Sequence, residues 1–158
     1  MPSVGFGPHN HTGCIQSGVT AAEAHCTQNN LQFTPVRRRV LEILLEKHRA
    51  LGAYEILDVL RGEGLGSQPP VAYRALDFLV KAGLAHRIER LNAFVACSHP
   101  GNTHAPAFLI CSSCAAVAEA TAQVVVGSLD KTAAEAGFQI ERTVVEAEGL
   151  CPECQDPA

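Results

Sequence analysis

Two pairs of cysteines are the residues of this chain best suited to chemistry. Each pair is separated by two residues, in CSSC at Cys111 and Cys114 and in CPEC at Cys151 and Cys154. Four thiolates from two such turns match the tetrahedral coordination of a structural zinc ion. The second pair lies close to the last residue, where a backbone usually frays, so a shared metal would hold this segment against the first pair.

These thiols also allow other chemistry. Redox-active dithiols would need an accessible thiolate with a low pKa, and an iron–sulfur cluster can also take four cysteine ligands. The chain has seven cysteines, an odd number, which argues against a framework of disulfides. Seven histidines accompany them, and this favours metal binding over redox chemistry.

A second group of candidate ligands consists of His86, Cys97, His104 and Glu119. One thiolate among nitrogen and oxygen ligands favours zinc over iron or manganese. Each residue also has an ordinary explanation: His86 as a core histidine on an apolar strand face, Cys97 as a small buried hydrophobic residue, and Glu119 as a solvated strand residue. From the residues alone, both interpretations stay open.

The first half of the chain predicts helices followed by a β-hairpin. Residues 1–20 contain no Lys or Arg and are interrupted by Gly and Pro, so we expect neither a signal peptide nor a stable helix there. Helices are predicted over residues 20–30, 34–48, 53–62 and 70–83. Thr34 is the expected N-cap of the second of these, with Pro35 at its first position.

The helix over residues 70–83 is predicted to be amphipathic. Its apolar stripe consists of Ala72, Ala75, Leu76, Leu79 and Val80. Its opposite face carries Tyr73, Arg74, Asp77 and Lys81. Alternating residues over 84–97, on either side of an Arg-Leu-Asn turn, predict a β-hairpin. Three helices followed by a hairpin form a winged helix-turn-helix, whose last helix enters the major groove of DNA.

The second half of the chain predicts a small α+β unit. Residues 97–105 are rich in Gly, Pro and Asn and indicate a hinge. Strands are predicted over residues 107–111, 115–120 and 138–149, with a helix over 121–137. Such a unit is small for independent stability, and packing against a second copy would stabilise it. The expected organisation is a flexible tail (1–20), a winged-helix DNA-binding domain (21–96), a hinge (97–105) and a small α/β dimerisation domain with a four-cysteine zinc site (106–158).

Charge and hydropathy are consistent with this organisation. Residues 31–95 carry 10 Lys and Arg against 7 Asp and Glu, a net charge of +3, whereas the remainder carries 2 against 9, a net charge of −7. A basic half joined to an acidic half is compatible with one nucleic-acid-binding domain. No run of 18 apolar residues predicts a membrane span, and we expect a reducing, cytoplasmic location.

Several motifs together resemble the ferric uptake regulator family. In order, they are FTPVRRRVL, AYEILD, PPVAYRALDFL, the histidine after the recognition helix, CSSC with a Glu five residues later, and the closing GLCPEC. The resemblance extends over residues 21–154 and is closest to the zinc uptake regulator branch, of which YRALDFL and GLC-x-x-C are characteristic. One departure is Val71, where the family usually has Thr or Ser.

The resemblance implies roles for individual residues. Cys111, Cys114, Cys151 and Cys154 match a structural zinc site, and His86, Cys97, His104 and Glu119 match a regulatory one, about two zinc ions per chain in all. His99 competes with His104 as the ligand. Tyr54 and Arg74 match residues that contact DNA, and Tyr73 and Lys81 are further candidates. Arg37, Arg38 and Arg39 are candidates for phosphate contacts or plain surface charges.

The implied protein is a zinc-dependent transcriptional repressor. It would bind double-stranded operator DNA as a homodimer, with no membrane association and no enzymatic activity. Two alternatives remain at this point: an iron, manganese or peroxide sensor of the same family, and a redox-active protein that uses its C-x-x-C pairs.

Overall fold

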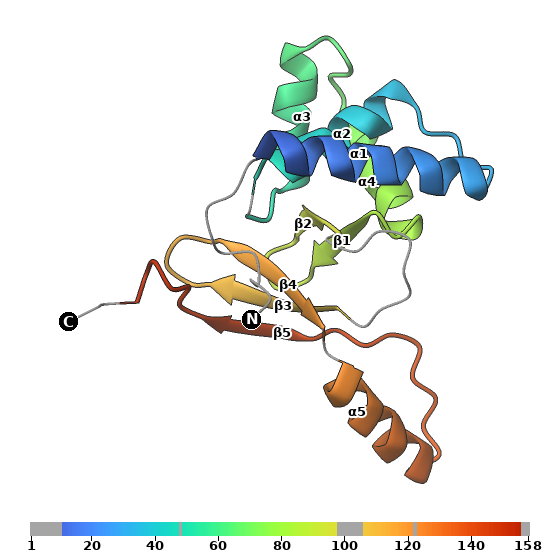
Figure 1. Cartoon of the computed structure of the whole chain (residues 1–158), viewed down its shortest axis with the longest axis vertical. Helices are drawn as coiled ribbons and strands as arrows, with labels where there is room; N and C mark the ends of the chain where they lie inside the picture. Colours follow the sequence, from blue (N-terminus) through green and yellow to red (C-terminus); the bar gives the residue numbers. More distant parts are fainter. Residues whose placement is uncertain (1–10, 48, 98–105, 122, 156–158) are drawn as a thin grey trace.

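The computed structural model describes residues 11–47, 49–97, 106–121 and 123–155, and over these residues the fold is α+β. Its elements, in chain order, are α1 (His11–Gln28), α2 (Pro35–Glu46), α3 (Ala53–Gly62), α4 (Pro69–Lys81), β1 (Ala85–Ile88), β2 (Ala93–Ala96), β3 (Pro106–Cys111), β4 (Val117–Thr121), α5 (Gln123–Glu135) and β5 (Glu146–Gly149). Helices α1–α4 gather at one end, the three-stranded sheet lies at the other, and the β1–β2 hairpin lies between them (Figure 1). Helix α5 projects from the sheet, away from the other helices.

Local signals in the sequence account for where the central helices begin and end. The Thr34 side chain accepts a hydrogen bond from the backbone N–H of Arg37 at 3.3 Å, which confirms it as the N-cap of α2. At the start of α3 the Glu55 carboxylate accepts from the backbone N–H of Gly52 at 2.9 Å. After α4 the chain turns at Gly83, whose φ of +75° favours glycine.

Helix α1 is longer than the sequence predicted. It begins at His11, so the expectation of a tail without a stable helix is wrong for residues 11–20. The helix lies along α2, and a Cβ atom on Gly18 would come within 2.7 Å of Leu45. Three of its side chains are buried there: Val19, Ala22 and Cys26. Because this packing stabilises the helix, it overrides the low helix propensity of the glycines.

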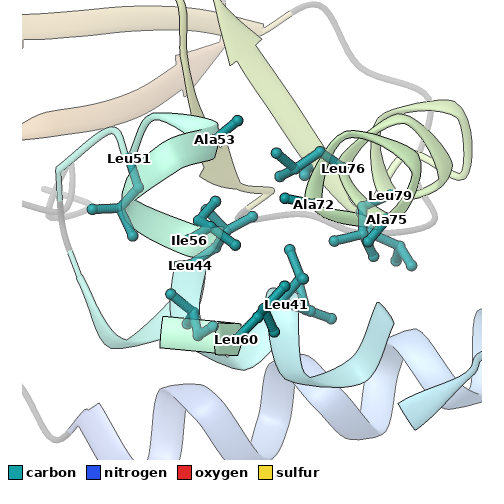
Figure 2. Packing of buried hydrophobic residues seen from close by; sticks show 14 of the residues in the cluster. Leu41, Leu44, Leu51, Ala53, Ile56, Leu60, Ala72, Ala75, Leu76 and Leu79 are labelled. Carbon is teal, nitrogen blue, oxygen red and sulfur yellow. The ribbon is translucent and has the colours of Figure 1, made fainter. Parts of the chain in front are cut away.

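The helical half of the chain has one apolar core, built from α2, α3 and α4 (Figure 2). Its fully buried side chains include Leu44, Ile56, Leu60, Leu76 and Leu79. Four of the five residues in the predicted stripe of α4 are buried, but Val80 is 36% exposed, so the prediction is wrong for that residue. One position past Leu79 turns a side chain by about 100° around a helix, which takes Val80 off the buried face.

The second half forms a three-stranded sheet in the order β4-β3-β5. Strand β3 pairs antiparallel with β4 and parallel with β5. The last strand was predicted over residues 138–149, but β5 contains only Glu146–Gly149, so that prediction is wrong for residues 138–145. Only these four residues pair with β3, while Phe138 and Val144 are exposed. Within residues 138–145, the Val145 carbonyl accepts from the backbone N–H of Phe108 at 3.0 Å, but the segment does not continue the ladder with β3, so it is not a strand.

A second apolar cluster joins the hairpin to the sheet. It consists of Ile88 from β1, Phe108 and Ile110 from β3, and Val117 from β4, with Ala50 and Val95 packed against it. Ile88 is completely buried by these contacts. Apart from Cys97, the predicted hinge lies outside the described residues. No helix among those described is long and apolar enough to cross a membrane.

The two adjacent residues Leu79 and Val80 give a direct test of this core. We expect Leu79→Ala to lower the free energy of unfolding by about 2–5 kcal/mol, because it removes a fully buried side chain from a packed core. The control Val80→Ala lies on the exposed side and should cost less than about 1 kcal/mol. Urea denaturation followed by circular dichroism measures both, and equal losses would contradict this assignment of the α4 faces.

Candidate metal centres and the exposed face of helix α4

The four paired cysteines meet at one end of the sheet. Cys111 ends β3 and Cys114 lies on the following turn, whereas Cys151 and Cys154 follow β5. The parallel register pairs Cys111 with Gly149 and so carries both turns to the same edge. All four Sγ atoms lie within 4.8 Å of one another, and those of Cys114 and Cys151 are 3.8 Å apart.

These distances fit a tetrahedral zinc ion. Zinc–sulfur bonds of about 2.3 Å place the ligand sulfur atoms about 3.8 Å apart. The backbone N–H of Ser112 donates to the carbonyl of Gly149 at 2.7 Å, and the Ser112 Oγ donates to the same oxygen at 3.0 Å. Hydrogen bonds between the two turns therefore help to keep the four thiols close together.

Local interactions shift the pKa values of Cys111 and Cys154 in opposite directions. Backbone N–H groups of Cys114 and Cys151 point at the Cys111 sulfur and lower its pKa to about 6. A hydrogen bond from Ser113 lowers the pKa of Cys154, but its proximity to the other three thiols outweighs this and raises the pKa to about 12. Four neighbouring thiolates repel one another, so full ionisation requires a cation between them.

The second group of candidate ligands comes from both halves of the chain. His86 lies on β1, Cys97 follows β2, and Glu119 lies on β4. Their ligand atoms lie within 4.8 Å of one another. The His86 Nε2 is 3.4 Å from the Glu119 Oε1, and the Cys97 Sγ is 4.0 Å from that oxygen. His104 and His99 lie outside the described residues.

Burial contradicts the ordinary explanation of one of these residues. The Glu119 side chain is only 5% exposed, so its interpretation as a solvated strand residue is wrong. Burying an ionised carboxylate costs free energy unless a positive charge lies beside it, and a divalent cation held by this cluster would supply that charge. Zinc bonds to nitrogen and oxygen of about 2.0–2.2 Å place such ligand atoms about 3.4 Å apart, so the observed spacing fits that ion.

The residues proposed to contact DNA lie on exposed surfaces of α3 and α4. Tyr54 is 65% exposed and Tyr73 is 47% exposed, so neither belongs to the core. Arg74 is exposed and forms no ion pair with the part of the chain that the structure describes. Lys81 is exposed and pairs with Asp77 at 2.9 Å.

The three consecutive arginines of α2 are engaged within the chain. The Arg37 guanidinium stacks over the Phe78 ring at 3.8 Å. Arg38 pairs with Glu23 at 2.6 Å, and Arg39 pairs with Glu63 at 2.8 Å. The side chain of Arg74 is therefore better placed for a new partner than these three.

Val71 makes an apolar contact at the start of α4. A Cβ atom on Gly66 would lie 2.7 Å from Val71 Cγ1, so this side chain packs closely on the loop that precedes the helix. The N-cap residue Gln68 makes no side-chain capping hydrogen bond. In this chain the position is used for packing of the α3–α4 connection.

Sequence reasoning missed one contact between the two halves. The Glu146 carboxylate on β5 accepts hydrogen bonds from the backbone N–H groups of Glu89 and Arg90 in the hairpin turn, at 2.7 and 3.1 Å. The partners are 57 and 56 residues apart, and no local pattern distinguishes Glu146 from the neighbouring glutamates.

A metal-bound cluster and a redox-active one differ in thiol reactivity. If the four cysteines hold a metal, we expect iodoacetamide to modify them slowly in the purified protein and quickly after treatment with a strong chelator. Cys26 is the control, because burial between helices raises its pKa and keeps it unreactive in both cases. Mass spectrometry of peptides measures both; rapid modification of the paired cysteines before chelation would favour the redox alternative.

Comparison with known proteins places this fold and these residues in one family. The model of the ferric uptake regulator family matches residues 28–148. The zinc uptake regulation protein of Escherichia coli (strain K12) is 39% identical over 140 residues, which cover 88% of this chain and 82% of that protein. The structure of a zinc uptake regulator complexed with zinc and DNA aligns with a TM-score of 0.85 at 39% identity, covering 89% of this chain and 94% of that chain.

Two crystal structures of another relative differ in how well they align. Holo XcZur gives a TM-score of 0.80 at 40% identity, over 87% of this chain and 96% of that chain. Apo XcZur aligns with a TM-score of 0.53 at 41% identity, over 90% of this chain and 98% of that chain. Because the identities are nearly equal, the difference in TM-score reflects the arrangement of the fold, which here is more similar to that of the holo structure. By sequence, fold and cysteine pattern, this chain belongs to the ferric uptake regulator family.

Proposed function

We propose that this protein is a zinc-responsive transcriptional repressor that binds double-stranded operator DNA as a homodimer. The observation that carries this proposal is the cluster of His86, Cys97 and Glu119, because its ligands come from the hairpin and from the sheet. Its mixed N, S and O ligand set suits zinc better than iron or manganese. Zinc held there, with His104 as the expected fourth ligand, would supply a bond between the two domains.

Short, rigid connections link the position of the hairpin to the direction of α4. Leu84 lies between α4 and β1 and is buried, and its backbone N–H donates to the carbonyl of Leu79 at 2.8 Å. The backbone N–H of Cys97 donates to the carbonyl of Leu84 at 3.0 Å. Fixing the hairpin on the sheet therefore also fixes the direction of α4.

The direction of α4 matters because a dimer reads two half-sites at once. In a helix-turn-helix dimer, the separation of the two recognition helices must match that of the half-sites. A domain arrangement fixed by zinc would thus raise operator affinity, and by linkage operator DNA would raise zinc affinity by the same factor. The better alignment with holo XcZur than with apo XcZur supports an arrangement set by metal.

The four-thiolate cluster has a different role in this proposal. Four sulfur ligands bind zinc more tightly than a mixed set, and the two turns they join hold β5 beside β3. We assign it a structural zinc, which gives about two zinc ions per chain with the regulatory one. The structure of a zinc uptake regulator complexed with zinc and DNA supports both zinc and DNA as ligands.

The homodimer would form through the second half of the chain. Helix α5 and the segment after it expose large apolar side chains, namely Val125, Leu129, Phe138 and Val144. A second copy packed on this surface would remove it from water. The two copies of α4 would then be held at a distance that depends on the angle between the domains of each subunit.

The number of zinc ions per chain tests the two-site assignment. We expect elemental mass spectrometry to find about two per chain in reduced protein and about one after dialysis against EDTA, because the mixed site releases zinc more readily. His86→Ala should leave about one before dialysis, whereas His25→Ala, on α1 and outside both clusters, should leave two. A single zinc ion in all three proteins, or preferential loading with iron or manganese, would contradict zinc sensing at the mixed site.

Arg74 provides a test of DNA recognition. We expect Arg74→Ala to weaken binding of the zinc-loaded dimer to genomic fragments selected by the wild-type protein by about 10- to 100-fold, as for loss of a bidentate contact to guanine. Lys131→Ala, on α5, removes the same charge far from α4 and should change affinity less than about threefold. Fluorescence anisotropy at fixed salt measures both, and equal losses would indicate a general charge effect.

A further inference from the structure

Three residues lie side by side across the sheet and face the hairpin. Phe108 on β3 is paired in register with Glu119 on β4 and with Glu146 on β5. Residues paired in this way project from the same face of a sheet. The Phe108 ring lies 5.4 Å from the His86 ring, and Glu119 is the carboxylate that contacts His86.

Glu146 contacts the same hairpin at its other end. Its two carboxylate oxygens accept from the backbone N–H groups of Glu89 and Arg90, which lie on the turn between β1 and β2. Hydrogen bonds from backbone N–H groups to an ionised carboxylate are stronger than those between neutral groups. Because the donors belong to the backbone, the contact fixes the backbone of the turn and does not depend on a flexible side chain on the hairpin.

Neighbouring charges form a polar border around this contact. Arg90 pairs with Glu148 at 2.7 Å, and Arg142 pairs with Glu89 at 2.9 Å. Both pairs are accessible to solvent and should contribute little by themselves. Within this border, the hydrogen bonds that Glu146 accepts from the turn are the contacts that fix the position of the turn on the sheet.

We propose that Glu146 is a positioning residue for the regulatory zinc site. This inference rests on the proposed function, since it assigns zinc to His86, Cys97 and Glu119. A metal contact at Glu119 would hold one end of the hairpin, and its turn would otherwise be held by apolar packing, which is not directional. Glu119 and Glu146 are two strands apart, about 10 Å by strand spacing, and attachments at both positions fix the orientation of the hairpin on the sheet.

The same residue connects the regulatory site to the four-thiolate cluster. Strand β5 has only four residues, with Glu146 at its first position and Gly149 at its last. Gly149 is bonded to Ser112, and Cys151 follows two residues later. The four-thiolate cluster therefore holds in place the short strand that presents Glu146, so loss of its metal should also release the hairpin turn.

The test compares Glu146→Gln with Glu141→Gln in the full-length protein that retains its EDTA-resistant zinc. Glu141 is exposed, so its substitution matches the change in charge without touching the hairpin. We expect Glu146→Gln to weaken binding of the exchangeable zinc by about five- to twentyfold, measured by competition with a chromophoric chelator. Each hydrogen bond from a backbone N–H group to the charged carboxylate stabilises the arrangement in which the hairpin packs on the sheet. Glu141→Gln should change it less than about twofold.

Amide hydrogen exchange gives a second readout that does not require zinc sensing. The backbone N–H groups of Glu89 and Arg90 should lose protection in Glu146→Gln, while the N–H groups of the α4 core remain protected. Glu146→Asp keeps the charge but shortens the side chain, so it should also lose zinc affinity if hydrogen bonds are responsible. An affinity equal to that of the wild type in Glu146→Asp, with a loss only in Glu146→Gln, would assign the effect to charge and overturn the proposal.

The outcomes separate this inference from the proposed function. If the wild-type protein binds an exchangeable zinc and Glu146→Gln binds it equally well, the positioning role of Glu146 is wrong and the sensor stands. If the wild type binds no exchangeable zinc, the sensor assignment fails and the inference fails with it. A fall in EDTA-resistant zinc below one per chain in Glu146→Gln would indicate a damaged sheet. In that case the zinc affinity of Glu146→Asp is compared with that of the wild type instead.

Discussion

The β1–β2 hairpin packs on one face of the three-stranded sheet through Ile88, Phe108 and Ile110, and this contact sets the geometry of the rest of the structure. On the helical side, three residues separate the hairpin from α4, and the last of them, Leu84, is buried. On the sheet side, the row that includes Phe108 also carries two carboxylates directed at the hairpin. Relative motion is expected between domains joined by a small apolar interface, so polar and metal contacts at its edges can select one arrangement.

The two candidate metal centres differ in ways that follow from their ligands and positions. The four-thiolate cluster joins segments of one sheet, and hydrogen bonds between its turns keep the sulfur atoms close. The mixed cluster joins different domains, so its ligand atoms come together only in the arrangement described here. A metal that binds one domain arrangement more tightly than another shifts the equilibrium toward the first, by an amount set by the difference in affinity. In the proposed function, this physical difference separates the structural site from the regulatory one.

Much of the helical half could be predicted because its signals are local. Thr34 and Pro35 mark the start of α2, and the spacing of apolar residues in α4 predicted all four of its buried positions and, wrongly, Val80 as a fifth. The misses have non-local causes. Residues 11–20 are helical because α1 packs on α2, and residues 138–145 are not a strand because β3 offers β5 only four paired positions. Glu146 could not be identified, since its partners are more than fifty residues away.

The sequence by itself determined the ligand types, the spacing of the cysteine pairs, the family and the order of the elements, because residue chemistry and short-range periodicity are properties of neighbouring residues. The tertiary structure decided which of these residues meet. It buried Glu119 beside His86 and Cys97, engaged the arginines of α2 within the chain, and left Arg74 on the exposed face of α4. It also paired Glu119, Phe108 and Glu146 in one row. Strand register and domain packing are long-range properties, and they alone place two carboxylates from distant segments against one hairpin.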